Sequence, residues 1–540
     1  MTTDSNNQIP KSLAARIAAT MEARGVQRMF GVPGGGSSLD LIEAAADRGI
    51  EFVLCRTENA AGIMASVTGE LTGIPGVVLT GIGPGAASAV NGVAYASLER
   101  APIIVLTDAH DEGATTPPHQ IFDQQSLFRP ISKAQQRLTP ADGATSFEQL
   151  FDLASSEPPG PVHIDLSSQD ARTESLAPTL WESPGLPDPD PETIEMAIKR
   201  IAGAKKPVLV VGLQCRAADR AAAANHLATS LHGPVLTTYK AKGVFAEADP
   251  RNIGLYTGAK LDNTVLAEAD LLIFCGVDPV EMIPGNWSHT APALVISESP
   301  ELSWPFSPDP ILVGSVSKIA DLLAGQPSKS EWSGEDFARH RSRLRDSVTN
   351  QAATGRSPDD IVDAVSNAAP QSARLAVDAG AHMFSAMTRW PANRPHDVLK
   401  SNGLSTMGYA VPAALASCLQ EPTRPTIALT GDGGMMMSLA ELSTAARLEA
   451  NITVVVLNDA ALSLIDIKQQ RQQRPPLGVR YPQVDFATAA RGMGCNSWKV
   501  GTQDPLEFAL AEAFESQGPT LLDVSLDPSG YRDQLAALRG

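Results

Sequence analysis

Short runs of valine, isoleucine and leucine alternate with alanine-rich, helix-prone stretches along almost the whole chain, and this alternation limits the folds open to it. Short apolar runs without polar alternation are typical of strands that are buried on both faces, as in parallel sheets covered by helices. The pattern therefore predicts an α/β protein built from doubly wound parallel sheets. Such sheets bind ligands beyond the carboxyl ends of their strands, and functional residues are expected there.

The chain of 540 residues is too long for one hydrophobic core, and the pattern divides it into three. We predict an N-terminal domain over residues 1–175, a central domain over 190–327 and a C-terminal domain over 357–540, each with its own doubly wound sheet. The proline density of residues 176–191 forbids a helix and predicts a linker. A charged, helix-prone stretch, 328–356, joins the last two domains.

The predicted strands fall into three groups along the chain. They are Arg28–Val32, Phe52–Leu54, Gly76–Thr80, Pro102–Thr107 and Pro161–Leu166; then Pro207–Gly212, Pro234–Thr238, Leu271–Gly276 and Ala293–Ser297; then Leu375–Asp378, Pro425–Thr430, Ile452–Leu457 and Thr520–Ser525. The segment PGVVLTGIGPGAA from Pro75 resembles PTIALTGDGGMMM from Pro425, because each has a strand, Leu-Thr-Gly and a glycine-rich turn. This similarity favours two related domains on either side of a different central one.

Charge and composition exclude several functions. Forty-two basic and 60 acidic side chains give a formal net charge of −18, which argues against a nucleic-acid partner. No apolar run approaches the roughly 18–20 residues of a membrane-spanning helix, so we expect no membrane partner. The N-terminus shows no secretory signal, and the five cysteines have no Cys-x-x-Cys spacing. We therefore expect a cytoplasmic protein with reduced thiols.

Two predicted strand ends in the last domain carry oxygen ligands. Gly431, Asp432, Gly433 and Gly434 follow one strand, and Asn458 ends the next, after the 24 residues 434–457. Carboxylate and carboxamide oxygens suit Mg²⁺, which also takes phosphate oxygens from a ligand. The glycines allow the backbone to approach a diphosphate, and the following helix directs free N–H groups at it. An ordinary capped turn explains Gly-Asp-Gly alone, but not its spacing to Asn458.

This arrangement resembles the diphosphate motif of thiamine-diphosphate enzymes, in which an Asp, an Asn and a main-chain carbonyl two residues later hold magnesium. By position, the resemblance implies a metal site of Asp432, Asn458 and the carbonyl of Ala460. Asp459 departs from the family, which usually has a second Asn there. The resemblance extends over nearly the whole chain and is closest to the acetolactate synthase-like branch of decarboxylases and carboligases.

A glutamate of the N-terminal domain is the family's second hallmark, and the segment CRTENAAGIMASVTGE places Glu58 just after a predicted strand. The resemblance gives Glu58 a hydrogen bond to a pyrimidine nitrogen of the cofactor. That contact favours the imino tautomer whose exocyclic nitrogen deprotonates the thiazolium carbon. The alternative is a carboxylate at the start of a helix, interacting with the helix dipole.

Two more segments resemble the family's cofactor pocket. SNGLSTMGYAVPAALAS places Met407 where a methionine wedges between the two cofactor rings, and Ser405 where a glycine carbonyl holds the exocyclic amine. VDAGAHMFS resembles an Asp-x-Gly-x-His turn, in which Gly380, Ala381 and His382 contact the diphosphate. The alternatives are a core methionine and a structural histidine. The remaining cofactor-binding residues that the resemblance implies are Gly35, Glu58, Gly83, Gly431, Asp432, Gly433, Gly434, Asn458 and Leu462.

The N-terminal domain also has two glycine-rich turns, GVPGGGSSLDL and GIGPGAASAVNG, which the resemblance assigns to the pocket wall around the thiazolium. The segment PPHQIFDQQSLFRPISK places Gln120 at the family's active-site glutamine, with His119 beside it. Glu58, Gln120 and His119 are therefore the predicted catalytic residues. Pyruvate-type decarboxylases have an adjacent His pair, and benzoylformate-type enzymes have a histidine where this chain has Gly81; neither is present.

With fewer proton donors, transfer to a carbonyl is favoured over release of an aldehyde. The resemblance implies thiamine diphosphate and Mg²⁺ as cofactors, and a 2-oxo acid and a carbonyl acceptor as substrates. The alternatives are a simple 2-oxo acid decarboxylase of benzoylformate or pyruvate type and a non-catalytic cofactor-binding homologue.

The segment after Asn458 lines the substrate pocket in relatives, with Leu464 and Ile465 at apolar positions and Lys468 facing either pocket or solvent. The central segment TTYKAKGVFAEADPRNIGLYTG contains no discriminating nucleotide motif, so we expect no FAD. In relatives one subunit holds the pyrimidine and its partner the diphosphate. The resemblance thus implies a homodimer or tetramer with the active site at the subunit interface.

Overall fold

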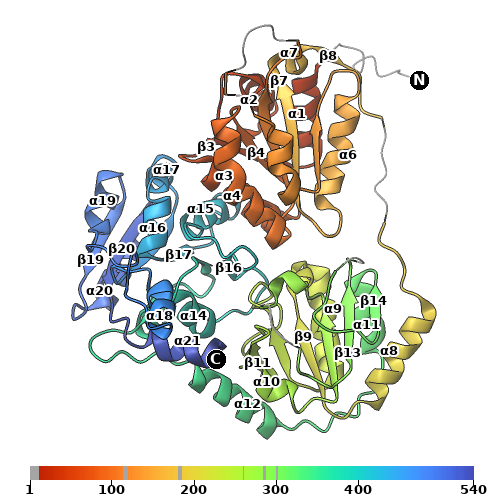
Figure 1. Ribbon diagram of the computed structural model, residues 1–540, viewed down its shortest axis with the longest axis vertical. Coiled ribbons are helices and arrows are strands. Elements are labelled where there is room, and N and C mark those ends of the chain that lie inside the picture. The colour runs from red at the N-terminus through yellow and green to blue at the C-terminus, as the bar shows by residue number, and fades with distance from the viewer. Residues whose placement is uncertain are drawn as a thin grey trace. The chain divides into compact units, whose positions relative to one another are not determined.

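Figure 1 shows the computed structural model of the chain, which describes residues 11–113, 119–120, 122–179, 185–259, 261–283, 287–299 and 302–539. The chain forms two compact units. One comprises residues 1–184 with 415–421, and the other comprises 185–414 with 422–540. Part of the predicted linker, 180–184, lies outside the described residues. The three predicted domain ranges stay a prediction.

Three six-stranded sheets contain almost all of the strands, and every neighbouring pair within them is parallel. This architecture confirms the predicted doubly wound parallel sheets. In spatial order the first sheet is β3 (Glu51–Leu54), β2 (Arg28–Val32), β4 (Gly76–Thr80), β5 (Ile103–Ala109), β7 (Pro161–Ser167) and β6 (Ala134–Arg137). A separate antiparallel pair, β1 (Lys11–Ser12) and β8 (Glu174–Ser175), lies in the same unit.

The other two sheets belong to the second unit. The central sheet runs β11 (Asn252–Leu255), β10 (Val235–Thr237), β9 (Pro207–Val211), β12 (Leu271–Cys275), β13 (Ala293–Ser297) and β14 (Ile311–Val313). The third sheet runs β16 (Val398–Lys400), β15 (Arg374–Val377), β17 (Thr426–Gly431), β18 (Ile452–Asn458), β20 (Thr520–Ser525) and β19 (Asn496–Val500).

The first and third sheets have the same topology. When the six strands of each are numbered along the chain, both follow the spatial order 2-1-3-4-6-5, whereas the central sheet follows 3-2-1-4-5-6. The two similar segments of the sequence, from Pro75 and Pro425, contain β4 and β17, the third strand of each order. This agreement supports the internal repeat around a different central domain.

Helices connect the strands as the alternating pattern predicts. In the first unit they are α1 (Leu13–Ala23), α2 (Ser37–Ala46), α3 (Glu58–Thr72), α4 (Pro84–Glu99), α5 (Gln124–Phe128), α6 (Gly143–Ser155) and α7 (Ser168–Arg172). Those associated with the central sheet are α8 (Pro191–Gly203), α9 (Ala218–Leu231), α10 (Asn263–Leu266), α11 (Val316–Ala324) and α12 (Gly334–Ser347). Among the described residues, no helix is both long and apolar enough to cross a membrane.

Helices of the last third are α13 (Pro358–Ala368), α14 (His382–Arg389), α15 (Ala410–Gln420), α16 (Asp432–Ser438), α17 (Glu441–Arg447), α18 (Ser463–Arg471), α19 (Phe486–Gly492), α20 (Leu506–Glu515) and α21 (Tyr531–Arg539). The core strands are fully covered: β18, for example, is buried along its whole length. All five cysteines are buried and free of disulfides, as their scattered positions predict.

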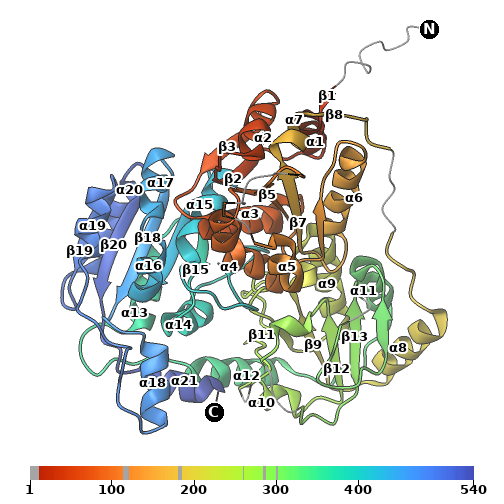
Figure 2. The same cartoon turned by 45° about the horizontal axis from the view of Figure 1, so that its top comes forward.

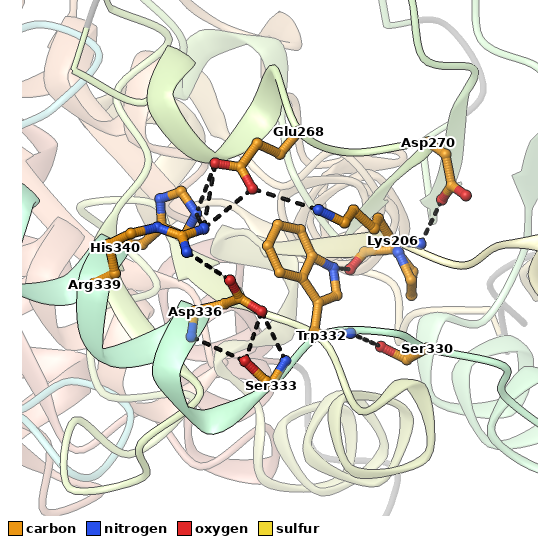
Figure 3. Close-up of polar contacts among 10 residues, drawn as sticks. Lys206, Glu268, Asp270, Ser330, Trp332, Ser333, Asp336, Arg339 and His340 are labelled. Atoms are coloured by element: carbon orange, nitrogen blue, oxygen red, sulfur yellow. Dashed lines mark hydrogen bonds and ion pairs between the residues drawn. The ribbon is translucent and has the colours of Figure 1, made fainter.

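The predicted charged connection after the central domain contains α12, which packs along the edge strand β11. Figure 3 shows how its first turns are attached. The indole of Trp332 donates a hydrogen bond to the carbonyl of Pro207 (2.9 Å), and the ammonium of Lys206 lies 4.8 Å from the ring centroid. Glu268 forms an ion pair with Arg339 (3.2 Å). These contacts attach α12 to the central sheet.

Candidate functional site

The spatial order of the third sheet reverses between β15 and β17, because β16 lies on one side of β15 and β17 on the other. Such a switch point opens a crevice at the carboxyl ends of the strands. A cavity of about 320 Å³ lies there. Its lining contains the predicted cofactor-binding residues Gly380, Ala381, His382, Ser405, Met407, Gly431, Asp432, Gly433, Gly434 and Leu462.

Asp432 is the first residue of α16 and has one oxygen occupied and one free. Its Oδ1 accepts hydrogen bonds from the Gly433 N–H (2.7 Å) and from the Tyr481 hydroxyl (2.8 Å). Its Oδ2 is buried and has no hydrogen-bond partner within the described chain. Burial raises the pKa of the Asp432 carboxyl above its ordinary value. A bound cation would compensate this buried carboxylate.

Asn458 ends β18, the strand next to β17, so its side chain reaches the same edge of the sheet. Its Nδ2 donates to the carbonyl of Val484 (2.9 Å) and to Oδ1 of Asp523 (2.8 Å). Both N–H bonds of the amide are thereby used, and Oδ1 is buried without a partner in the described residues. The predicted oxygen ligand of Asn458 is thus the atom left free.

Ala460 has a left-handed backbone conformation, with φ +58°. Its carbonyl accepts a hydrogen bond from the Tyr481 N–H (3.1 Å), which leaves one of the two lone pairs for another donor or a cation. Tyr481 therefore contacts two of the three predicted metal ligands. The sequence reasoning missed it, since no motif links Tyr481 to a strand end 49 residues earlier.

These oxygens fit magnesium held partly by a phosphate ligand. No cluster of three or more His, Cys, Asp or Glu side chains suitable for a metal ion occurs in the described parts of the chain. A site of one carboxylate, one carboxamide and one carbonyl is poor in charge and needs an anionic ligand to complete it. The assignment of Asp432, Asn458 and Ala460 as metal ligands stays a prediction.

Gly434 shows why this turn requires glycine. A Cβ atom added there would lie 2.5 Å from Oδ2 of Asp378 and 2.8 Å from Oγ1 of Thr430. Asp378 is fully buried and accepts hydrogen bonds from the Gly408 N–H (3.1 Å) and the Thr430 hydroxyl (2.9 Å). Burial raises the pKa of Asp378 to about 6. Asp378, which we did not predict as a site residue, joins the end of β15 to the end of β17 and to the loop at Gly408.

His382 begins α14 at the cavity and is 4% exposed. Burial lowers the pKa of its imidazole to about 4, so the ring is neutral near pH 7. Its Nε2 is buried and unpaired in the part of the chain that the structure describes. An unpaired buried nitrogen at the cavity wall fits the predicted contact with a diphosphate, because a phosphate oxygen would satisfy it.

Met407 and Leu462 form the apolar wall beside the glycine turn. A Cβ atom added at Gly433 would lie 2.7 Å from Cδ2 of Leu462 and 3.0 Å from Cε of Met407. Ser405 has φ +53°, a left-handed conformation that glycine adopts at lower cost. This conformation explains why the related family has glycine there. The chain retains the turn with a serine, whose hydroxyl donates to the carbonyl of Asn402 (3.1 Å).

The outer wall of the cavity comes from α18 and α21. Leu464, Ile465 and Lys468 line it, and Ile465 and Lys468 are also exposed, so Lys468 lies at the rim. Asp459 lines it too, and burial raises the pKa of that carboxyl to about 7. Tyr531 of α21 is a lining residue that sequence reasoning missed, because a C-terminal helix carries no strand-end signal.

The first unit gathers its own predicted residues at the carboxyl end of β4. Glu58 is the first residue of α3, and its Oε1 lies 3.3 Å from where a Cβ atom of Gly85 would be. A Cβ atom on Gly83 would lie 2.2 Å from the carbonyl oxygen of Gln120, so these two residues touch. His119 is exposed, and its carbonyl accepts a hydrogen bond from Nε2 of His110 (2.8 Å).

Two buried polar side chains hold the glycine-rich turns of this unit. Asp108 accepts from the N–H groups of Gly36 (3.1 Å) and Ser38 (2.6 Å), while a Cβ atom at Gly35 would meet nothing within 4 Å. Gln124 accepts from the Gly83 N–H (2.8 Å) and donates to Oδ1 of Asp165 (2.7 Å). A shared active site between these residues and the cavity of the second unit stays a prediction.

The switch point of the central sheet is filled by the protein itself. A Cβ atom on Gly212, after β9, would lie 2.2 Å from Cα of Val277, after β12. The buried Glu281 accepts hydrogen bonds from the Leu213 N–H (3.0 Å) and the Thr238 hydroxyl (2.5 Å), and burial raises its pKa to about 7. The expectation that no flavin binds to this domain stays a prediction.

Comparison with known proteins assigns all three parts of the chain. Residues 11–127 match the N-terminal thiamine pyrophosphate (TPP) binding domain of thiamine pyrophosphate enzymes, 194–318 match the central domain, and 378–524 match the C-terminal TPP binding domain. The chain is 26% identical to an acetolactate synthase of Bacillus subtilis over an alignment of 541 positions. The alignment covers 96% of this chain and 93% of the relative.

Two decarboxylases are also similar. A probable 2-ketoarginine decarboxylase of Pseudomonas aeruginosa is 27% identical over 518 residues, covering 93% of this chain and 91% of the relative. The solved structure of a thiamine diphosphate-dependent 4-hydroxybenzoylformate decarboxylase from Rhodococcus jostii is 21% identical, with a TM-score of 0.83 over 96% of this chain and 99% of that one. This last likeness shows the shared fold.

Proposed function

This chain belongs to the thiamine pyrophosphate enzymes, in their acetolactate synthase-like branch, and from that premise we propose that it is a carboligase. Its substrates are a 2-oxo acid and a carbonyl acceptor. The reaction releases carbon dioxide by breaking the bond to the carboxylate carbon. It forms one new carbon–carbon bond to the acceptor, whose oxygen becomes a hydroxyl. The exchange is redox-neutral and needs no oxidant or reductant.

The observation that carries the proposal is a set of unpaired buried atoms at the strand ends of the third sheet, two of them on residues that line the cavity and one, on Asn458, at the end of the neighbouring strand. Asp432 Oδ2, Asn458 Oδ1 and His382 Nε2 have no hydrogen-bond partner in the described chain. Unpaired buried atoms also occur elsewhere in the described chain, but these three lie together at the strand ends of one sheet, where a polar ligand would pair them. Mg²⁺ with a diphosphate would fit: the two oxygens would hold the cation, and the imidazole would contact a phosphate oxygen.

Bound thiamine diphosphate supplies an electron sink for the cleavage of a bond next to a carbonyl carbon. The chain's own residues bind and orient it. Met407 would support the cofactor rings from the cavity wall, and Glu58 would hold a proton at a pyrimidine nitrogen. Leu464 and Ile465 would give the acyl group of the substrate an apolar contact. Glu58 and Asp432 act from different subunits of a homodimer or of a tetramer of dimers.

The likeness to acetolactate synthases favours transfer to a carbonyl acceptor. The second candidate is a simple 2-oxo acid decarboxylase. The likeness to the probable 2-ketoarginine decarboxylase favours it, because its sequence identity and coverage are similar to those of the acetolactate synthase. The two functions differ in whether the acyl carbon ends in an aldehyde or in a new carbon–carbon bond.

The deciding experiment incubates the purified protein with thiamine diphosphate, Mg²⁺ and a panel of 2-oxo acids, with and without added aldehydes or ketones. Carbon dioxide release and product structure by NMR are recorded together. The carboligase predicts a 2-hydroxy ketone or a 2-hydroxy-3-oxo acid. Aldehyde alone, at every acceptor concentration, would establish the decarboxylase instead. Absence of turnover by protein that binds the cofactor would show a non-catalytic homologue.

A further inference from the structure

A second and larger cavity, of about 600 Å³, lies in the second unit away from the cofactor cavity. Its walls come from the edge strand β11, the helices α12, α13 and α14, and the C-terminal end of α21. Figure 2 shows α12 alongside β11 and near α21, and both helix contacts are recorded in the structure. A volume of this size is in the range of sites that bind small molecules.

The charges on the lining of this cavity are unbalanced. Its two carboxylates are already paired, Glu247 with Lys242 and Asp363 with Arg389. The lining also contains Arg341 and Arg345, for which the structure shows no carboxylate ion pair within the described residues. Within the described residues, Arg341 donates to the backbone carbonyl of Glu247 (2.6 Å), and the nearby Asp249 carboxylate is itself paired with Arg251 (2.6 Å).

Arg341 and Arg345 are four residues apart on α12, so both lie on one face of the helix. Leu344 and Val348, the apolar residues of that face, line the cavity beside them. Arg341 is half-buried, whereas Arg345 and Arg343 are both exposed; of these two exposed arginines, Arg345 lines the cavity and Arg343 does not. The same helix therefore presents two cations and an apolar surface to one cavity that is open to solvent on the side of Arg345.

The rest of the lining combines apolar and polar residues, and its apolar part can receive an apolar body. Tyr239, Leu255 and Met387 contribute to it, with the side chain of Met387 buried. A guanidinium forms paired hydrogen bonds with a carboxylate or phosphate, while the apolar wall excludes a fully hydrated inorganic ion. The chemistry on both walls fits an anion that carries an apolar body.

We propose that this cavity is a binding site for a small organic anion, a carboxylate or a phosphate ester with an apolar body, held by Arg341 and Arg345. The site is separate from the cofactor cavity and independent of the reaction proposed above. One helix connects the two: α14 carries His382 at the cofactor cavity and Met387 and Arg389 at this one. The helix rises about 1.5 Å per residue, so His382 and Arg389, seven residues apart, are separated by about 10 Å along its axis.

The test uses the fluorescent anion 8-anilinonaphthalene-1-sulfonate, which has an acidic group and an apolar body, with the full-length protein. We expect saturable binding to the wild type. Arg345→Glu should weaken it at least tenfold, because a charge-assisted hydrogen bond is lost and the anion is repelled. Ala248→Trp, which places a large side chain in the cavity, should lower the number of bound probe molecules. Circular dichroism confirms that each variant is folded.

Two variants serve as matched controls. Arg343→Glu makes the same charge change on the outer face of α12 and should bind like the wild type. Lys468→Glu changes the rim of the cofactor cavity and should also leave the probe affinity unchanged. Equal binding by wild type, Arg345→Glu and Ala248→Trp would overturn the proposal. Loss of binding only in Lys468→Glu would also overturn it, because the probe would then occupy the cofactor cavity.

Displacement of the probe identifies the anion. Phenyl phosphate and phenylacetate are compared, with benzyl alcohol as the uncharged analogue. Displacement by either anion, and by the alcohol at least tenfold less well, supports the site and shows which acidic group it prefers. Displacement by benzyl alcohol as effectively as by both anions would contradict the role of the two arginines.

Discussion

Asp523 holds the amide of Asn458 through a hydrogen bond of 2.8 Å from Nδ2 of the asparagine to Oδ1 of the aspartate. The other oxygen of Asp523 accepts from the Phe486 N–H (3.0 Å), so both ends of this carboxylate are fixed. Because an ionised carboxylate and the carbonyl of Val484 only accept, the amide nitrogen must face them, and Oδ1 is the atom left without a partner in the described residues. A residue outside the cavity thus decides which atom of Asn458 is presented to a ligand.

Replacement of Asp523 should therefore weaken metal binding although none of the predicted metal-binding residues is changed. An asparagine at position 523 can turn its own nitrogen toward Asn458, and the orientation of the amide is then lost. We expect Mg²⁺ affinity in the presence of thiamine diphosphate to fall about 10- to 100-fold in Asp523→Asn, the usual size of such effects. Isothermal titration of Mg²⁺ measures it. Asp533→Asn, at an exposed position of α21, is the control; unchanged affinity in both variants would contradict the idea.

Asp432 itself should be indispensable for retaining the cofactor. Asp432→Ala removes the only carboxylate among the predicted ligands, and we expect Mg²⁺-dependent binding of thiamine diphosphate to be lost. Equilibrium dialysis with and without Mg²⁺ measures the retained cofactor. If the variant keeps the cofactor in a Mg²⁺-dependent manner, the metal site lies elsewhere.

The role proposed for Glu58 predicts an effect on proton transfer rather than on binding. Glu58→Gln should slow deuterium exchange at the thiazolium carbon of the bound cofactor about 100-fold or more, the usual contribution of a positioned acid or base. Cofactor affinity should change little. Glu43→Gln, an exposed change in α2, is the control. Exchange at the wild-type rate in Glu58→Gln would refute the relay.

The lowered pKa of His382 leads to a prediction of how the stability of the protein depends on pH. Burial lowers its pKa from 6.5 to about 4, so the folded protein resists protonation where the unfolded chain accepts it. The stability that the neutral ring contributes is present above pH 6.5 and is lost as pH falls toward 4, by about 3 kcal/mol in total. His382→Asn should show a correspondingly smaller loss over this window. Urea unfolding of the cofactor-free protein at several pH values measures the difference. If the free energy of unfolding falls equally with pH in the wild type and in His382→Asn, the loss does not come from His382.

The close packing around Gly434 leads us to expect a purely steric effect when a methyl group is added there. Gly434→Ala brings a methyl group to within 2.5 Å of Asp378 Oδ2, so the loops that Asp378 joins must move apart. We expect a loss of stability of about 1–3 kcal/mol. Gly492→Ala, in α19 with nothing within 4 Å of the added atom, should be neutral or slightly stabilising. Thermal unfolding compares the two, and equal midpoints would disprove the steric explanation.

Strand prediction succeeded in the interiors of the three large sheets and, except for β3, failed at their edges. The strands missed there are β6, β11, β14, β16 and β19, each at the edge of a six-stranded sheet, and the two-residue strands β1 and β8 were missed as well. Ala134–Arg137 and Asn496–Val500 contain mostly polar residues, because an edge strand is less covered than a central one. A method that depends on continuous apolar runs cannot recognise such strands.

The sequence by itself determined the α/β class and the residues at the strand ends, Asp432, Asn458 and His382 among them. These follow from local order along the chain: a strand, a glycine turn and a helix lie within about ten residues of each other. Only the tertiary structure identified Tyr481, Asp523, Asp378 and Tyr531. The first three act through a hydrogen bond with a residue 30 or more positions away, and Tyr531 lines a cavity formed by residues far from it in the sequence; no local pattern specifies such partners.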